Sequence, residues 1–587
     1  MATSLSINFM GFRGRQAPGV FVLRAVAAAL LAAGLATAQA QQTPNAGDVM
    51  RETARPPSLP PKADPQLPKA QEVRPALQDK GGFKLVVNGF RITGNQSIPE
   101  NDLQLLLLDN LGKDNTFNDL QTAAAAISNY YRNRGYFVAR AYLPQQEIQG
   151  GIVEIAVLEG TVGKATPQIT GTPRTKPEVL QRILDANVPA GSVVREAPLE
   201  RAALLANDLP GMAASVTLDP GSQTGQTDVA LNATEGKMFT ASVDVDNYGN
   251  NYTGSNRLGT TLYFNSPLGL GDQASVRLMT SDRQLNFARL SYQVPVGGNG
   301  MRVGAAWSKV NFDVCCQTGI DPSGAGRVAS LYMLQPLARS RNLSAYFNAG
   351  IDNKESVNRS GVGPTRVRNL DVLTLGTSVE SRDTLGGGGL VYGNASFSAG
   401  HAGIKDPTDQ STDAAGPNVA GSFTKLGVQV ARTQRLTDRF SLYGGVNGQL
   451  ASKNLDPVEK FSLGGAQGVR SYASGEATGD RGYIAQVELR ADLPIQGSLL
   501  WQGFLFTDYG NITVNRNNYV VAGLTPNSYS LKSWGLGLNV AKTGAFQIRA
   551  VWATGIGDNP GKSPVNGTDA EGKTSRSRLW FQAVTQF

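Results

Sequence analysis

The sequence predicts a C-terminal transmembrane antiparallel β-barrel of about sixteen strands, preceded by two small α+β domains. Three observations lead to this fold class. The chain ends on an amphipathic strand, residues 237–587 alternate between apolar and polar side chains, and residues 83–236 repeat one mixed helix and strand pattern. Alternation with a period of two is typical of strands, whereas apolar spacing near 3.6 residues indicates helices.

The last eleven residues, SRLWFQAVTQF, are expected to form one strand. The largely apolar face holds Leu579, Phe581, Ala583 and Phe587, and the mixed face holds Trp580, Gln582, Val584 and Gln586. A closed barrel can end in this way because its last strand pairs with its first. We therefore interpret Phe581 and Phe587 as a barrel-end signal. A soluble β-domain that ends on a core strand remains the alternative.

The barrel segment alternates in the sense expected of a membrane wall. In residues 483–493 the apolar side chains share one face, and Gln486, Glu488, Arg490 and Asp492 share the other. A lipid-facing surface cannot hold these charges cheaply, whereas a wet lumen can. A soluble barrel or sandwich would bury the apolar set instead. The length of residues 237–587, with longer outer loops, fits roughly sixteen strands.

Residues 1–40 are expected to form a secretory signal. A basic region with Arg13, Arg15 and Arg24 precedes an Ala/Leu run at 25–36, and Ala38-Gln39-Ala40 fits a small-residue cleavage site. The mature chain would then start at Gln41. No later stretch has 18 consecutive apolar residues, so the sequence predicts export without a membrane helix, to a bacterial periplasm or outer membrane.

Residues 41–82 predict a proline-rich linker that contains one proline-free island. Prolines recur from Pro44 to Pro75 and favour extended chain. The island, residues 46–55, is long enough for about two or three helical turns but too short to be stable alone in water. A helix here would need a pocket.

Residues 83–160 predict the first α+β domain. Phe83, Leu85 and Val87 alternate as in a strand and lead to a turn at Gly94-Asn95. A helix is expected from Pro99 through Leu107, and a second one through Leu120, Ala124, Ile127 and Tyr131, ending at Gly135. Two strands follow, at 136–143 and 152–158. The predicted order is β-α-α-β-β.

Residues 161–236 repeat this order. Helices are expected at 176–184 and 198–209, and strands at 214–218 and 227–232. The period of about 75 residues indicates two tandem domains of one kind and not a solenoid.

Composition excludes several classes of function. His401 is the only histidine, and its surroundings predict a loop, so a Ser-His-Asp site would depend on it alone and a two-histidine metal site is impossible. The net charge is +8, but basic residues are dispersed among acidic ones, which does not favour nucleic-acid binding. We expect no catalytic residue, no cofactor, no metal and no nucleic-acid partner.

Several motifs together resemble those of a known family. GIVEIAVLEG (151–160) and LDPGSQTGQTDVAL (218–231) resemble the ends of two POTRA domains. DNYGNNYTGSNR (246–257) with NSPLGLGD (265–272) resembles a barrel opening, GGAQGVRSY (464–472) a conserved inward loop, and FTDYG (506–510) the strand motif that faces this loop. The chain is similar to the outer-membrane transporters of two-partner secretion, the haemolysin secretion/activation and filamentous-haemagglutinin transporter family, whose barrels follow periplasmic POTRA domains.

The resemblance implies a site inside the barrel. In the family, the loop arginine pairs with the strand aspartate, here Arg470 with Asp508. The loop motif is Gly468, Val469, Arg470, Ser471 and Tyr472, and the strand motif includes Phe506 and Gly510. A bidentate arginine–carboxylate contact in a narrow lumen would pin the loop. Ser471 departs from the usual glycine, and this makes the turn uncertain because serine tolerates fewer backbone conformations.

The resemblance also implies a function and partners. Such proteins carry one large exoprotein, an adhesin, haemolysin or toxin, unfolded from the periplasm to the cell surface. The POTRA domains bind its N-terminal secretion domain, and a helix plugs the resting pore, here the island at 46–55. Outer-membrane lipid, the barrel-assembly machinery and periplasmic chaperones are further expected partners. A POTRA sheet edge can bind an extended peptide or can stack against the next domain, and we weight these equally.

Three other functions remain as alternatives. An insertase that folds other barrels shares the POTRA-barrel plan. A diffusion porin would not need residues 83–236, and a surface enzyme on a barrel is disfavoured by the single histidine. Two POTRA-like repeats, the linker and the hairpin at 218–231 favour the transporter.

Overall fold

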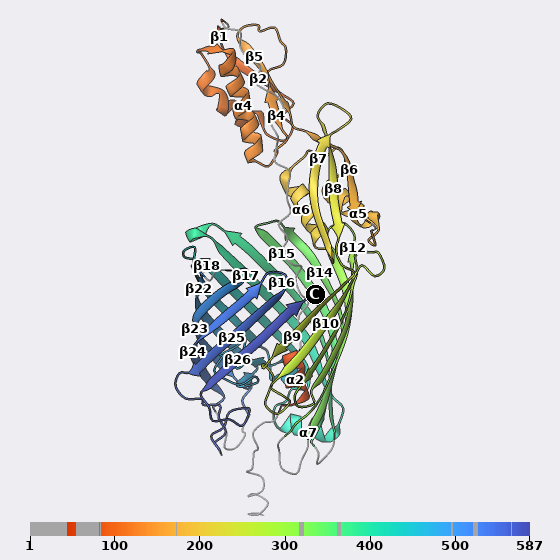
Figure 1. The fold of residues 1–587 in the computed structure, drawn as a ribbon, viewed down its shortest axis with the longest axis vertical. Coiled ribbons are helices and arrows are strands. Elements are labelled where there is room, and N and C mark those ends of the chain that lie inside the picture. The colour runs from red at the N-terminus through yellow and green to blue at the C-terminus, as the bar shows by residue number, and fades with distance from the viewer. Residues whose placement is uncertain are drawn as a thin grey trace, which may run out of the picture. The chain divides into compact units, whose positions relative to one another are not determined.

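The computed structural model describes residues 44–53, 82, 84–171, 173–315, 322–360, 365–494, 497–519, 526–564 and 566–587. The predicted signal at 1–40, most of the predicted linker and Phe83 lie outside these residues. The described chain forms a short helix, two α+β domains and a β-barrel (Figure 1). Within the described residues, no helix has the length and apolar character needed to cross a membrane.

The first α+β domain has a three-stranded sheet in the order β2-β5-β4, in which β2 runs parallel to β5. Its elements are β1 (Lys84–Val86), β2 (Gly89–Thr93), α3 (Glu100–Gln104), the 3-10 helix η1 (Leu105–Asn110), β3 (Asp114–Thr116), α4 (Phe117–Asn133), β4 (Arg140–Tyr142) and β5 (Ile152–Leu158). Helix α4 begins with a capping box between Thr116 and Asp119. Its apolar face packs Leu120, Ile127 and Tyr131 against the sheet.

The sequence misplaced the opening strand of this domain. The sheet strand is β2, whereas β1 pairs with β3 outside that sheet. Phe90 and Ile92 also alternate, and they share the core with Val87 of the earlier run. Parallel pairing with β5 is what makes β2 the sheet strand. Of the strand expected at 136–143, only β4 is formed. Tyr136 instead caps the end of α4, where its N–H donates to the Tyr131 carbonyl and its ring packs edge-on against Tyr131.

The second α+β domain has the sheet order β6-β8-β7 and a single apolar core. Its elements are β6 (Thr161–Thr170), α5 (Pro177–Asn187), α6 (Glu196–Asn207), β7 (Met212–Pro220) and β8 (Gln226–Glu235). Proline is favourable at the first position of α5, because a backbone N–H there would have no carbonyl within the helix to donate to. The helices and the closing hairpin overlap the predicted ranges and extend beyond them.

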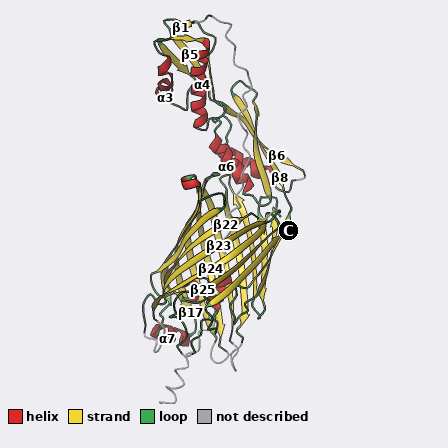
Figure 2. Cartoon of the chain, turned by 60° about the vertical axis from the view of Figure 1, so that its left-hand side comes forward, coloured by secondary structure: helices red, strands yellow, loops and turns green. Residues whose placement is uncertain are grey.

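Within the described residues, sixteen antiparallel strands close into a barrel, which confirms the predicted fold class. The strands are β9 (Phe239–Asp246), β10 (Arg257–Asn265), β11 (Gln273–Ser281), β12 (Asn286–Val296), β13 (Met301–Asp313), β14 (Ser323–Arg339), β15 (Leu343–Arg359), β16 (Arg366–Asp383), β17 (Gly389–Ile404), β18 (Gly421–Arg435), β19 (Phe440–Ala451), β22 (Arg481–Leu493), β23 (Leu500–Thr513), β24 (Ser528–Lys542), β25 (Phe546–Gly555) and β26 (Ser577–Gln586). Figure 2 shows this wall of strands, and most of the helices lie in the two α+β domains.

The barrel wall separates apolar from charged side chains. Leu331 is 63% exposed on the outside, whereas Arg277 is buried inside and makes a bidentate contact with Asp244 at 2.8 and 2.9 Å. Strand β22 has the predicted faces, because Val487 is exposed and Glu488 is buried. This outward apolar, inward polar arrangement is that of a membrane barrel.

The last strand closes the barrel against the first. In the described part, β26 pairs with β9 from Gln582 opposite Asp246 to Gln586 opposite Ser242. Phe587 exchanges two backbone hydrogen bonds with Ala241 beyond the end of β26. Leu579, Phe581 and Phe587 are exposed, and Trp580 is buried on the inner side, as the strand prediction expects.

Helix α2 (Ala46–Thr53) lies inside the barrel (Figure 1). Val49 and Met50 pack in one cluster with Phe287, Val310 and other residues of the barrel wall. The Ala46 N–H donates to Asn358 Oδ1 on β15 at 2.7 Å, and Arg51 Nη1 donates to the Pro457 carbonyl at 2.6 Å. The island therefore finds a pocket that stabilises a helix too short to persist alone.

Candidate functional site

Residues 461–479, the inward loop, fold back into the barrel between β19 and β22. Short strands β20 (Phe461–Ser462) and β21 (Thr478–Gly479) pair at its base. Its interior backbone bonds include Val469 N to Leu463 O at 2.7 Å and Gly465 N to Tyr472 O at 3.1 Å. Because these bonds are internal to the loop, the loop is a compact unit that presents Arg470 to the barrel wall.

Arg470 lies at the centre of the site and is 1% exposed. Its Nε and Nη2 donate to the two carboxylate oxygens of Asp508 at 3.0 and 2.6 Å, and its backbone N–H donates to Asp508 Oδ2 at 3.0 Å. The guanidinium also lies 3.4 Å from the centre of the Phe506 ring. The structure thus brings Arg470 together with Asp508, the partner that the resemblance implied, and with Phe506 of the same strand motif.

Two acidic residues share this arginine. Arg470 Nη1 donates to Glu488 Oε1 on β22 at 2.6 Å, and Glu488 also contacts Arg490 at 2.7 Å. The sequence analysis placed Glu488 on the inner face of its strand but did not assign it to the site. Alternation identifies the face of a strand, but it does not identify which inward residue meets the loop.

The carboxylate of Asp508 has further donors from the wall. Ser533 Oγ on β24 donates to Oδ2 at 2.9 Å, and Gln486 Nε2 on β22 contacts Oδ1 at 3.3 Å. Gln486 Nε2 also donates to the Gly468 carbonyl at 2.9 Å. Three neighbouring strands therefore hold the carboxylate and the loop in one geometry, as buried charges require.

Glycines allow the loop to approach the wall. A Cβ on Gly510 would lie 2.9 Å from methyl carbons of Leu463 and Val469. A Cβ on Gly468 would lie 2.0 Å from the Leu463 carbonyl oxygen, which the backbone of the loop cannot relieve. Both motif glycines are therefore required by close contact, one on each side of the interface.

Ser471 is accommodated in the loop turn. The residue is buried, and it is not among the non-glycine residues with positive φ. The turn therefore does not require the glycine that is usual in the resemblance. Tyr472, the last residue of the loop motif, donates from its hydroxyl to the Lys532 carbonyl on β24 at 3.3 Å.

Trp580 on the last strand contacts the other side of the loop. Its indole N–H donates to the Arg470 carbonyl at 2.6 Å, and its ring packs edge-on against Tyr248 with centres 5.8 Å apart. The sequence analysis treated Trp580 only as part of a mixed strand face. Phe581 and Phe587 face outward and do not join this site.

The prediction that His401 lies in a loop is wrong. His401 is part of β17, is exposed, and has Ser422 on β18 at 3.4 Å from its Nδ1. The flanking small residues Ala399 and Gly400 are compatible with a strand, and pairing with both β16 and β18 decides the conformation. Among the described residues, no group of His, Cys, Asp and Glu side chains is arranged to hold a metal ion.

Comparison with known proteins supports the same architecture. Residues 225–540 match the family model of haemolysin secretion/activation proteins ShlB/FhaC/HecB, and residues 85–160 match the ShlB-type POTRA domain. The chain is 27% identical to the heme/hemopexin transporter protein HuxB of Haemophilus influenzae, over 87% of this chain and 88% of that protein. It is 23% identical to the outer membrane transporter CdiB of Dickeya dadantii, over 72% and 74%.

A solved structure has the same fold. CdiB from Escherichia coli superposes with a TM-score of 0.68 and 20% identity, over 89% of this chain and 94% of that chain.

Proposed function

The chain belongs to the haemolysin secretion/activation family, ShlB/FhaC/HecB, and is an outer-membrane transporter of two-partner secretion. We propose a separate role in this transport for the POTRA domains, for helix α2 and for the inward loop. The protein secretes a cognate exoprotein from the periplasm to the cell surface, with its POTRA domains in the periplasm. The named relatives suggest cargo of the adhesin, haemolysin or toxin class, including proteins involved with haem or hemopexin. No step of this transport needs an enzymatic reaction.

The POTRA sheet edges are the proposed docking sites for the N-terminal secretion domain of the cargo. Strand β7 pairs only with β8 in the described residues. On its other edge the Asn207 side chain occupies the N–H and C=O of Ala214, and the strand beyond Ala214 is the part proposed to accept a peptide. The two domains meet elsewhere, where the Glu196 N–H donates to the Gly135 carbonyl at 2.9 Å and Arg195 lies over Tyr136. This junction leaves β7 to an extended peptide, which favours docking over domain stacking.

Helix α2 is the proposed plug of the resting pore. It packs against inward-facing side chains of the wall and against the 3-10 helix η3 (Pro457–Glu459). The chain that follows the helix, residues 54–82, is rich in proline and gives the helix a long tether. The plug can therefore leave without unfolding the barrel.

The Arg470–Asp508 pair is the proposed lock that holds the inward loop at its working position. The single observation that carries this proposal is the buried bidentate contact between the loop arginine and the wall aspartate. Its burial makes the loss of either partner costly, on the order of 3–5 kcal/mol, because the other charge is left unpaired. The outward strand end at Phe581 and Phe587 is the proposed signal for the barrel-assembly machinery, with periplasmic chaperones delivering the chain to it.

Export assays with three arginine variants test the lock. Arg470→Ala should abolish or strongly reduce release of the cognate exoprotein, while heat-modifiable gel migration shows a folded barrel. Arg470→Lys should also be impaired, because an ammonium cannot reproduce the fork geometry. Arg432→Ala is the matched control, since Arg432 makes a bidentate contact with Asp383 on the barrel wall that involves no residue of the inward loop. Normal release by Arg470→Ala would contradict the proposed lock.

A further inference from the structure

The seam between the first and last strands is the shortest ladder of the barrel in the described residues. Strands β26 and β9 pair over five residues each, whereas β25 and β26 pair over nine. Beyond Asp246 one further backbone bond is made, from the Asn247 N–H to the Phe581 carbonyl at 3.2 Å. The Asn247 side chain then continues the ladder, donating to the Leu579 carbonyl and accepting from the Phe581 N–H, both at 2.8 Å. The outer end of the seam therefore depends largely on this side chain.

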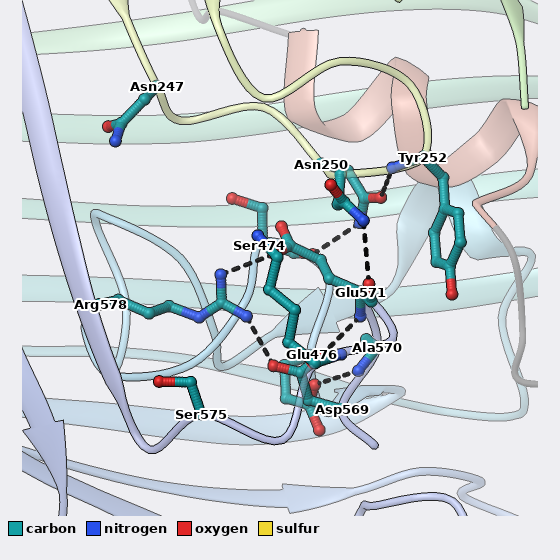
Figure 3. A network of polar contacts seen from close by, with 12 residues as sticks. Asn247, Asn250, Tyr252, Ser474, Glu476, Asp569, Ala570, Glu571, Ser575 and Arg578 are labelled. Carbon is teal, nitrogen blue, oxygen red and sulfur yellow. Dashed lines mark hydrogen bonds and ion pairs between the residues drawn. The ribbon is translucent and has the colours of Figure 1, made fainter. Parts of the chain in front are cut away.

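The returning arm of the inward loop, Ser474–Glu476, contacts the chain that follows the first strand. Ser474 Oγ donates to the Tyr248 carbonyl at 2.8 Å, and Asn250 Nδ2 donates to the Ser474 carbonyl at 3.2 Å. Asn250 is itself fixed, because its Oδ1 accepts from the Tyr252 N–H at 2.9 Å. Figure 3 shows Asn250 beside Ser474 in this arrangement.

The same arm also contacts the chain that precedes the last strand. Glu476 is 2% exposed, and its two carboxylate oxygens accept from Asn559 Nδ2 at 2.6 Å and from the Ala570 N–H at 2.7 Å (Figure 3). Asn559 and Ala570 lie in the segment between β25 and β26. Glu476 thus reaches the opposite side of the seam from Ser474.

Arg578 fastens that segment to the last strand itself. Arg578 is on β26, and its two terminal nitrogens each lie 2.6 Å from a carboxylate oxygen, one of Asp569 and one of Glu571. The Glu571 carbonyl accepts from Asn251 Nδ2 at 3.2 Å, which adds a direct tie to the first strand's side (Figure 3). Glu476 is therefore linked to β26 through the segment that contains Asp569, Ala570 and Glu571.

We propose that Ser474 and Glu476 form a second anchor of the inward loop, which bridges β9 and β26 and keeps the outer end of the barrel seam closed. The proposal rests on the proposed function of the loop, but it concerns a different contact from the Arg470 lock. The two anchors hold different parts of the inward loop. Arg470 contacts the wall of β22, β23 and β24, whereas Ser474 and Glu476 reach across the seam. Both residues are positioning residues.

Disulfide trapping across the seam tests this second anchor. Val245 and Ala583 are register partners in β9 and β26, so Val245→Cys with Ala583→Cys reports a closed seam. Cys315 and Cys316 are replaced by serine in every variant, so that the two introduced cysteines are the only ones in the chain. The full-length protein is oxidised in isolated outer membranes, and the trapped fraction is followed with time.

Glu476→Gln is the decisive variant. The glutamine has the same shape but turns a donor toward one of the two donors that now contact the carboxylate. We expect trapping to slow by roughly tenfold, the scale of one lost charge-assisted hydrogen bond in a buried site. Ser474→Ala should slow it less, because it removes one neutral hydrogen bond. Should Glu476→Gln fail to insert, Ser474→Ala still decides the question.

Asp558→Asn provides the matched control. Asp558 lies in the same segment as Asn559 but pairs with Arg576 at the surface, where both side chains are more than half exposed. Its loss should leave trapping unchanged. Unchanged trapping in folded Glu476→Gln and Ser474→Ala proteins would overturn the second anchor. Because the readout is the seam and not export, this result would leave the Arg470 lock standing, and an export defect in Arg470→Ala would not rescue the second anchor.

Discussion

The second α+β domain and the inward-loop site are centred on opposite kinds of side chain. The second domain encloses Leu180, Leu184 and other apolar residues in its core, whereas the most buried large side chain of the inward-loop site is Arg470. An apolar core is held by non-directional burial, and it tolerates exchange of similar volumes. A buried charge cluster is held by directional contacts, each of which must be satisfied.

In the barrel, the interactions that stabilise the wall differ from those that position the loop inside it. The barrel wall closes through backbone pairing of its strands, so its interior does not need an apolar core. Its inward charges are then available to hold a loop and a plug in chosen places. A buried ion pair adds little to the free energy of unfolding, because desolvation of the two charges offsets much of their attraction. Its geometry is nevertheless specific, so it can fix the position of the loop.

The largest expected effect comes from removing the α+β domains. Deletion of residues 83–236 should abolish export but leave a folded pore, because cargo recognition belongs to the domains and closure belongs to the barrel. Exoprotein in the culture supernatant measures the first result, and conductance in planar bilayers measures the second. Export at a normal level by the isolated barrel would contradict this assignment.

A smaller effect is expected from the plug. Removing residues 46–53 should raise channel conductance in planar bilayers, since α2 occupies part of the lumen. Gly47→Leu is a finer change, because a Cβ on Gly47 would lie 2.7 Å from the Val458 nitrogen and should displace the helix. Gly393→Ala, where a Cβ meets nothing within 4 Å, is the control. Equal conductance in all variants would show that α2 is not a plug.

The smallest effect on transport is expected from core truncation. Leu180→Ala should destabilise the second domain by about 2–5 kcal/mol, because it leaves a cavity in a fully buried site. Leu331→Ala on the lipid-facing wall should not unfold that domain. Denaturant unfolding, followed by protease sensitivity of the α+β domains, measures the contrast. Equal sensitivity of both variants would contradict the division between core and wall.

The sequence predicted those features that depend on local pattern. Alternation identified the barrel and the inward face of β22, and 3.6-residue spacing identified α4. The same reasoning failed at His401, where small flanking residues suggested a loop but pairing on both sides makes a strand. It also misplaced the first domain's opening strand, because two adjacent runs alternate and both reach the core, whereas only β2 pairs with β5.

By itself, the sequence determined which faces of the strands are apolar and, through motif resemblance, that Arg470 and Asp508 belong together. Only the tertiary structure decided that Glu488 and Trp580 complete that site and that Glu476 reaches across the seam. These contacts join residues far apart in the chain, such as Trp580 with Arg470 and Ser474 with Tyr248. A periodic pattern specifies the direction of a side chain, but its neighbour depends on barrel closure and on the path of the inward loop.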